Sequence, residues 1–394
     1  MPIRTVHVTY DGALDPLGGS QVVPYLLGLA RRGVSITLVS FEKNERWEDR
    51  PGRTAMAQRL ADAGIRWRPV RYHRAPRLPA TLWDLWRGSR VIAREGRDRG
   101  VHLIHSRGDA AMLMARWARP LISSCPRLVQ EVRGLFSEER RVIASWRPGG
   151  LLDRTVRSVE SANLRDADGL LAVMSEAGLE ALRRLRNPLP PHRFMPNSVD
   201  LAAFTPRSTD ESAEFGLAYC GSLGGWYMSR EMVAFARVAS QRIPGKVLFL
   251  TPQVDEARRA GALPDWAVTV AARPAEVPGW LRRARASFFF VRPTPAKRAS
   301  SPTKLAESLA SGLPLAANPG IGDVEAVLEP QRVGVLVCSF DEGTYRGAAA
   351  RLARLLADPG VSSRCRRVAE RRYDLAKAVD LYHDLYRELI AERL

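Results

Sequence analysis

The sequence is poor in cysteine, lysine and histidine, and it contains no long apolar run. Its four cysteines stand far apart among 394 residues, with no Cys-x-x-Cys pair and no neighbouring histidine cluster, so we expect neither a zinc site nor a disulfide framework. No stretch reaches the roughly 18 uncharged apolar residues that indicate a transmembrane helix. The first ten residues also lack the pattern of a secretory signal peptide. We therefore expect a cytoplasmic protein.

The basic charge of the chain comes almost wholly from arginine. Of 60 basic residues only five are lysine and 55 are arginine, and the formal net charge is +18. The arginines are scattered along amphipathic segments, and no aromatic residues interleave with them in a nucleic-acid motif. We interpret this charge as a solvated surface and expect no nucleic-acid partner. The alternative is attraction to acidic glycans, phosphorylated ligands or anionic lipid, which would place the protein peripherally at the inner membrane face.

Apolar runs of strand length alternate with segments of helical spacing along the whole chain. A polar segment without apolar spacing, residues 207–214, interrupts the alternation, which then restarts. Strands that alternate with helices form parallel sheets between layers of helices, so the fold class is α/β, with two doubly wound, Rossmann-like domains facing a cleft. The expected divisions are residues 1–205, 206–375 and a closing helix at 376–394.

The loops that follow the carboxyl ends of the strands are the places to look for a ligand site. The segment 299–307 follows an apolar strand, and Ser301 as N-cap with Pro302 behind it predicts the start of a helix. The amides of Thr303 and Lys304, with the charge of Lys304, favour an anion there, and the carboxylate of Glu307 suits a pair of ribose hydroxyls. These residues together predict a sugar-nucleotide site. An ordinary capped helix with an exposed Lys and Glu is an equal alternative.

Three further loops stand at strand ends and contain either glycines or charges. Glycines let the backbone approach a ligand closely, and charges directly after an apolar strand suggest a site. Plain turns and isolated surface charges are the alternatives. The loops are 220–227, with Gly221, Ser222 and Gly224; 15–21, with Gly18 and Gly19; and 130–139, with Glu131 and Arg133.

Several of these segments resemble known glycosyltransferase motifs. Residues 196–200, Pro-Asn-Ser-Val-Asp, resemble the Pro-Asn-Gly-Val-Asp segment that ends the N-terminal domain of GT-B glycosyltransferases. Residues 301–307, 312–314 and 320–323 are similar to the donor-binding segment of those enzymes, and residues 18–20 to their N-terminal glycine loop. The motifs come in the expected order over nearly the whole chain. The sequence most resembles the retaining glycosyltransferases of family 4.

The resemblance implies a GT-B fold whose closing helix returns to the first domain. It also implies transfer, with retention, of a sugar from a nucleotide-diphosphate sugar to a hydroxyl or amine of a sugar, lipid-linked or small-molecule acceptor, for a surface glycan precursor or a specialised metabolite. The nucleotide-sugar is a substrate, so no cofactor and no metal is expected. The oligomeric state stays open. The donor-binding residues that it implies are Gly18, Gly221, Ser222, Gly224, Arg273, Arg292, Lys297, Ser301, Thr303, Lys304, Leu305 and Glu307, and the catalytic residues are Arg133, Glu131 and Gly19.

The sequence departs from the family pattern at three points. Glu307 matches the second glutamate of the family's paired-glutamate motif, but the first falls at Ala299. Only Arg230 stands where the family often has an Arg and a Lys, so Arg292, Lys297 or Lys304 would neutralise the diphosphate. Arg133-Gly134 replaces a common His-Gly. A non-catalytic GT-B partner and a basic protein that binds anions or membranes therefore stay as alternatives, whereas the acidic or cofactor residues of an epimerase or phosphorylase are not found.

Three remaining features have a structural interpretation. Asp166-Ala167-Asp168 looks like a metal-binding Asp-x-Asp, but it lies between a helix and a strand and is read as a structural boundary. Trp83 and Trp86 stand three apart on a basic helix, and this spacing favours a packed face over insertion at a membrane interface. His105 ends a strand, where a structural role is the commoner one.

Overall fold

The computed structural model describes residues 2–144, 146–208, 211–259 and 263–392, and it divides into two compact units. The first unit contains Met1–Met174, Gly178–Met195 and Leu375–Leu394, and the second contains Ser175–Ala177 and Pro196–Asp374. The boundary therefore falls at Met195/Pro196 by contacts, ten residues before the expected division. It falls there because the backbone amide of Asn197 donates a 2.9 Å hydrogen bond to Ser301 Oγ of the second unit.

The first unit is built on a parallel sheet, as the alternation of strands and helices predicts. Within the described residues the strand order is β3-β2-β1-β4-β5-β6-β7. All the neighbouring pairs are parallel. The strands are β1 (Arg4–Thr9), β2 (Ser35–Glu42), β3 (Arg66–Arg71), β4 (Leu103–Arg107), β5 (Arg127–Val132), β6 (Gly169–Val173) and β7 (His192–Met195).

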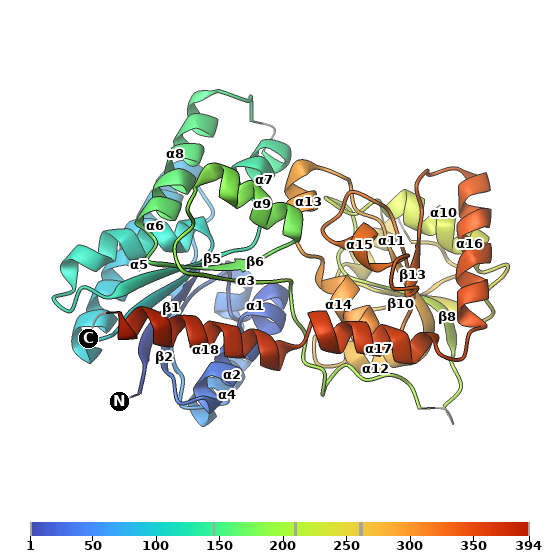
Figure 1. The fold of residues 1–394 in the computed structure, drawn as a ribbon, viewed down its shortest axis with the longest axis horizontal. Helices are drawn as coiled ribbons and strands as arrows, with labels where there is room; N and C mark the ends of the chain where they lie inside the picture. The colour runs from blue at the N-terminus through green and yellow to red at the C-terminus, as the bar shows by residue number, and fades with distance from the viewer. Residues whose placement is uncertain (1, 145, 209–210, 260–262, 393–394) are drawn as a thin grey trace. The chain divides into compact units, whose positions relative to one another are not determined.

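Helices cover both faces of this sheet (Figure 1). The helices α2 and α18 share one core cluster, and α5 and α6 share another with the opposite side chains of β1 and β4. The helical segments are α1 (Pro16–Gln21), α2 (Val23–Arg31), α3 (Asn44–Glu48), α4 (Arg50–Asp62), α5 (Arg77–Arg99), α6 (Asp109–Ala118), η1 (Arg119–Leu121), α7 (Phe136–Ile143), α8 (Leu151–Asp166), α9 (Glu176–Leu185) and α18 (Leu375–Ala391).

The last helix, α18, packs on the first unit, which confirms the expected return of the chain. Its residues Tyr382, Leu385 and Leu389 are fully buried at helical spacing. The contact with α2 is close because Gly28 has no side chain there: a Cβ on Gly28 would lie 2.7 Å from a methyl group of Val379. The apolar stripe of α18 therefore completes the core of a unit whose other core residues all come before Pro196 in the chain.

The second unit has its own parallel sheet in the order β10-β9-β8-β11-β12-β13. The helices α10 and α16 pack together, as do α14 and α17, and α12 lies against a separate cluster with β8 and β9 (Figure 1). The elements are β8 (Phe215–Cys220), α10 (Ser229–Ala239), β9 (Lys246–Leu250), α11 (Val254–Arg259), β10 (Val268–Val270), α12 (Val277–Arg282), β11 (Ala284–Phe289), α13 (Pro295–Ala299), α14 (Thr303–Ala310), β12 (Leu315–Ala317), α15 (Val324–Val327), β13 (Gly334–Leu336), α16 (Glu342–Leu356) and α17 (Val361–Arg372).

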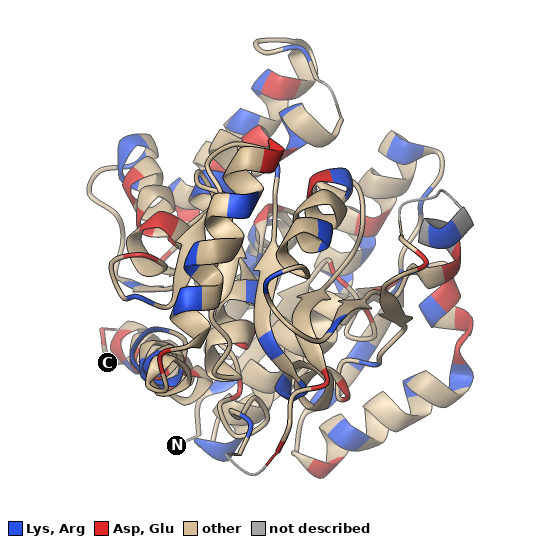
Figure 2. Ribbon diagram, turned by 90° about the vertical axis from the view of Figure 1, so that its right-hand side faces the viewer, with Lys and Arg blue, Asp and Glu red and all other residues tan. Residues whose placement is uncertain are grey.

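Basic and acidic residues are spread over many helices of the protein, as Figure 2 shows. The arginines do not form one block, in agreement with the scatter seen in the sequence. Among the described residues no helix is both long enough and apolar enough to cross a bilayer. The expected linker at 207–214 has no helix or strand in the residues described there, and residues 209–210 lie outside them.

The strand orders identify one preferred ligand position in each unit. In a doubly wound sheet a ligand binds beyond the carboxyl ends of the strands, where the strand order reverses. The order reverses between β1 and β4 in the first unit, and between β8 and β11 in the second. The loops after these four strands contain most of the residues that the sequence singled out.

Candidate functional site

The loops after β8 and β11 are joined by backbone contacts in the second unit. Tyr227 forms an isolated antiparallel bridge with Val291, and the amide of Arg292 donates a 2.8 Å hydrogen bond to the carbonyl of Trp226. Gly224 turns the β8 loop: its amide donates to Ser229 Oγ at 2.9 Å. The two loops thus form one ordered rim at the switch point of the sheet.

The ammonium group of Lys304 lies under this rim, at the start of α14. Its Nζ donates a 2.9 Å hydrogen bond to the hydroxyl of Tyr227 and lies 4.2 Å from the centre of that ring. A Cβ on Gly221 would stand 2.3 Å from the same Nζ atom. Gly221 also has φ +141°, a conformation that residues with side chains rarely adopt. A side chain at 221 would therefore strain the backbone and push the Lys304 ammonium group away from its present position.

The charge of Lys304 is stabilised by its surroundings. Burial favours the neutral amine, but the phenol oxygens of Tyr227 and Tyr219 outweigh it and raise the pKa of Lys304. Conversely, the positive charge of Lys304 is the main cause that lowers the pKa of Tyr227. Lys304 is therefore a permanent cation at the amino end of a helix, which is the arrangement that favours an anionic ligand.

Glu307 lies one turn further along α14, beside Lys304 and the end of β8. Burial raises the pKa of its carboxyl to about 7, against the opposing charge of Lys304. Both side chains also affect the thiol of Cys220, whose pKa burial raises to about 12. Among the described residues the Glu307 carboxyl has no hydrogen-bond partner. A half-buried carboxyl with unused acceptor atoms suits a ligand that brings its own donors.

The start of α14 differs from the sequence prediction. The N-cap is Pro302, and no side chain caps the helix, whereas Ser301 was expected in that position. Ser301 is instead buried, and its Oγ accepts from the amide of Asn197. The amide group of Asn197 also donates to the Ser301 carbonyl and, at 3.3 Å, to Thr303 Oγ1. Asn197 and Ser301 thus join the 196–200 segment to α14, a link that the sequence did not reveal.

Further basic residues stand around the same rim. Lys297, on α13, places its Nζ 4.3 Å from the centre of the Trp226 ring. Arg292, five residues before Lys297 in the loop after β11, is exposed. Ser222 takes part through its backbone, because its carbonyl accepts a hydrogen bond from the hydroxyl of Tyr219.

Two of the predicted donor-binding residues are engaged elsewhere. Arg273 is exposed after β10, and its Nε donates a 2.8 Å hydrogen bond to Glu276 Oε1. Leu305 is a core residue, 1% exposed, whose amide donates to the carbonyl of Pro302 at 3.1 Å. Neither residue joins the group around Lys304, since its polar atoms or its side chain are already used.

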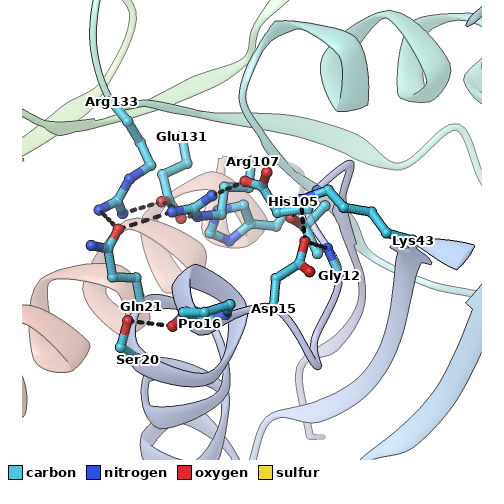
Figure 3. A network of polar contacts seen from close by, with 12 residues as sticks. Gly12, Asp15, Pro16, Ser20, Gln21, Lys43, His105, Arg107, Glu131 and Arg133 are labelled. Carbon is cyan, nitrogen blue, oxygen red and sulfur yellow. Dashed lines mark hydrogen bonds and ion pairs between the residues drawn. The ribbon is translucent and has the colours of Figure 1, made fainter. Parts of the chain in front are cut away.

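At the switch point of the first unit, Figure 3 shows a buried polar network. Glu131, at the end of β5, lies 2.8 Å from Arg133 Nη1 and 3.3 Å from Arg107 Nε. Both arginines donate to Gln21 Oε1, and Arg107 also pairs with Asp11 at 2.6 Å. The sequence predicted Glu131 and Arg133 but missed Arg107, Gln21 and Asp11. The position of Arg107 at the end of a buried strand was the signal available for it.

The charges in this network fix the protonation of Glu131. Burial alone would raise its pKa, but His105, Arg133 and Arg107 together lower it well below the usual value. Glu131 is therefore an ionised carboxylate held by two guanidinium groups. It is not placed to act as a free nucleophile.

Three buried groups, His7, His105 and Glu131, form the one set among the described residues with metal-ligand spacing. The set does not suit a divalent cation. Its carboxylate already serves two arginines, and an ion there would stand among like charges. His105 is further engaged by the hydroxyl of Tyr386 on α18. We therefore read His105 and its neighbours as a structural network.

The glycine segment of the first unit is helical, whereas the sequence predicted a loop before a helix. Gly18 and Gly19 both lie inside the short helix α1. Gly18 is required for packing, since a Cβ there would lie 1.9 Å from the carbonyl oxygen of Gly12. At Gly19 nothing lies within 4 Å of such a Cβ. The loop before α1 is held by Glu42, which accepts from the amide of Ala13 at 2.8 Å.

The Asp-x-Asp segment has the structural role that the sequence favoured. Asp166 pairs with Arg116 at 2.6 Å, and Asp168 pairs with Arg127 at 3.1 Å.

The interpretation of Trp83 and Trp86 as a packed face was wrong. Their side chains are 51% and 50% exposed, because α5 turns other residues towards the core.

Comparison with known proteins identifies the fold and one domain. Residues 19–198 match the model of the glycosyl transferase 4-like domain. No curated protein matches the sequence. Among solved structures, a sucrose-phosphate synthase from Thermosynechococcus elongatus has TM-score 0.71 and 18% identity, covering 99% of this chain and 100% of that chain. A glycosyltransferase from Rickettsia africae has TM-score 0.69 and 10% identity, covering 99% of each chain. HepE from Anabaena, in complex with UDP-glucose, has TM-score 0.63 and 13% identity, covering 99% of each chain.

Proposed function

The chain has the GT-B fold, and its residues 19–198 match the model of a glycosyl transferase 4-like domain. We propose that it is a retaining glycosyltransferase that uses a nucleotide-sugar donor. One observation supports this most: Lys304 and Glu307 stand together at the end of β8, at the switch point of the second sheet. A half-buried cation beside a carboxyl with free acceptor atoms matches the two polar parts of a nucleoside diphosphate, its phosphates and its ribose.

The donor residues act in two groups. Lys304 neutralises the diphosphate, with Lys297 and the exposed Arg292 nearby on the same rim, and Gly221 and Gly224 let the backbone approach. Glu307 accepts hydrogen bonds from the ribose hydroxyls. Uridine is the first base to test, since the similar HepE structures hold UDP and UDP-glucose.

Transfer with retention requires no second free carboxylate. The bond between the sugar C1 and the diphosphate oxygen breaks, the acceptor oxygen or nitrogen forms its bond to C1 on the same face, and its proton passes to the departing diphosphate. The protein then has to position the two substrates and stabilise negative charge. We assign the sugar contact to Arg133, with Glu131 as the residue that positions it, and close backbone approach to Gly19. No step in this scheme uses a metal.

A direct test is turnover of a defined donor. Purified protein is incubated with α-linked nucleotide-sugars and a panel of hydroxyl and amine acceptors, and release of nucleoside diphosphate is measured with the product's anomeric configuration by NMR. We expect an α-linked product, formed equally with EDTA or with Mg²⁺. A β-linked product would contradict retention, and dependence on Mg²⁺ would contradict the metal-free scheme.

One observation favours a second candidate, a GT-B protein that binds nucleotide without transfer. Ala299 stands where the resemblance expects a glutamate, and it is 2% exposed. Its carbonyl accepts a hydrogen bond from the amide of Ser175 at 3.1 Å. Saturable nucleotide binding with no turnover of any donor would favour this candidate.

The expected cytoplasmic location stays a prediction.

A further inference from the structure

The first half of α5 presents large apolar side chains to solvent. They lie on one face, at positions one helical turn apart, and the rings of Trp83 and Trp86 are 5.0 Å from centre to centre. A soluble helix normally turns such residues inward. The side chains and their exposed fractions are Leu78 61%, Leu82 59%, Trp83 51% and Trp86 50%.

The orientation of α5 is fixed by its other face, so these side chains have no place in the core. Leu85, Ile92 and Ala93 are buried against the sheet. Asp84 is buried too, and its carboxylate binds the ring of His73 at 2.6 Å and the hydroxyl of Tyr10 at 3.2 Å. Turning Trp83 inward would break these contacts.

Arginines flank the apolar residues and are not neutralised. Among the described residues, none of Arg74, Arg77, Arg87 and Arg90 forms an ion pair or a side-chain hydrogen bond. The three acidic groups of the same helix are engaged elsewhere: Asp84 is buried, Glu95 is buried and paired with Arg68 at 2.7 Å, and Asp98, near the far end of the helix, pairs with Arg94 at 3.9 Å. We call these four arginines and the four apolar residues the α5 surface.

We propose that the α5 surface docks the protein on an anionic lipid bilayer. Tryptophan is suited to the boundary between headgroups and acyl chains, because its ring is apolar and its N–H is polar. Leucines beside it enter the acyl region, while arginines at the same level attract anionic headgroups. Unpaired positive charge around an apolar centre is the complement of such a bilayer. The proposal does not depend on the transfer reaction.

Vesicle cosedimentation tests this directly. The full chain is mixed with vesicles of phosphatidylcholine containing phosphatidylglycerol, or with pure phosphatidylcholine vesicles. We expect saturable binding to the anionic vesicles only, weakened at least tenfold in the double variant Trp83→Gln/Trp86→Gln. The triple variant Arg74→Gln/Arg77→Gln/Arg90→Gln should also lose binding.

Matched variants separate this surface from general stickiness and net charge. Trp266→Gln removes an exposed tryptophan of the second unit, and Arg242→Gln/Arg282→Gln/Arg354→Gln removes three exposed arginines there; both should bind vesicles as wild type does. Circular dichroism checks that all variants fold. Absence of vesicle binding, or equal loss with the matched variants, would overturn the proposal. A dimer that the Trp83/Trp86 variant converts to a monomer, without vesicle binding, would instead assign the surface to a second copy of the chain.

Discussion

The Nζ atom of Lys304 lies 2.9 Å from the hydroxyl oxygen of Tyr227, in the space that a side chain at Gly221 would occupy. The loop after β8 and the start of α14 therefore position one cation together. In the proposed donor site this cation faces the diphosphate. The affinity of the site for a diphosphate therefore depends on the residues that position the Lys304 ammonium group as well as on the lysine itself.

Replacement of Tyr227 by phenylalanine tests that dependence. The variant keeps the ring over Lys304 but removes the hydrogen bond, whose net value is about 1 kcal/mol, or roughly a fivefold change in an equilibrium constant. We expect nucleoside diphosphate to bind about fivefold more weakly by calorimetry. Tyr72→Phe, which removes a hydroxyl in the first unit, is the control. Equal affinity in wild type and Tyr227→Phe would show that the hydroxyl does not position Lys304.

Gly221→Ala should disturb the same site by displacement. The added methyl carbon would stand 2.3 Å from Lys304 Nζ, and φ +141° is unfavourable for alanine. We expect about 1–3 kcal/mol of lost stability from the backbone alone, with binding of nucleoside diphosphate reduced at least tenfold. Gly279→Ala, where a Cβ meets nothing within 4 Å, is the control. Unchanged affinity in Gly221→Ala would contradict the packing described for Lys304.

The raised pKa of Glu307 predicts how stability depends on pH. Between its ordinary value of 4.5 and about 7, the folded protein keeps a proton that the unfolded chain has lost. Stability contributed by this group therefore falls as pH rises through that window. We expect Glu307→Gln to gain in melting temperature over wild type from pH 5 to pH 8. A difference between the two proteins that is constant with pH would contradict the assignment.

The buried carboxylate of Glu131 predicts the opposite dependence. Its pKa is lowered, so its contribution to stability is present above the unfolded value of 4.5 and disappears as pH falls below it. Glu131→Gln leaves Arg107 and Arg133 without their shared partner and should cost about 3–5 kcal/mol at pH 7 in urea unfolding. Glu180→Gln, at an exposed ion pair, should change stability by less than about 1 kcal/mol. If Glu131→Gln cost no more stability than the control, the result would contradict a buried, ionised Glu131 that holds the two arginines.

The fold was predictable from the sequence because its signals are local. Apolar runs separated by helical spacing predicted two parallel sheets, and the apolar stripe of α18 was visible in Leu385 and Leu389. The position of Lys304 was predictable too, from a cation at an expected helix start after a buried strand. These features depend on neighbours within a few residues.

The contacts between distant segments were not predictable. The hydroxyl of Ser301 serves Asn197, 104 positions earlier, so its expected role as N-cap is not realised. Arg107 belongs to no recognisable motif, and it joins the Glu131 network because β4 and β5 pair with Arg107 opposite Glu131. The exposure of Trp83 depends on which face of α5 meets the sheet, and that face contains Leu85 and Ile92 as well as the buried Asp84. Helical spacing alone does not distinguish the two faces when both contain apolar residues.

The measurement that tests the central claim most directly is a calorimetric titration of UDP, GDP, ADP, dTDP and CDP into wild type, Lys304→Ala and Lys246→Ala. Lys246 is an exposed lysine at the start of β9, so its variant has the same change in charge away from the site. We predict that one nucleotide binds wild type and Lys246→Ala alike, at one site, and binds Lys304→Ala at least tenfold more weakly. Binding that Lys304→Ala retains in full, or no binding of any nucleotide to wild type, would contradict the proposed donor site.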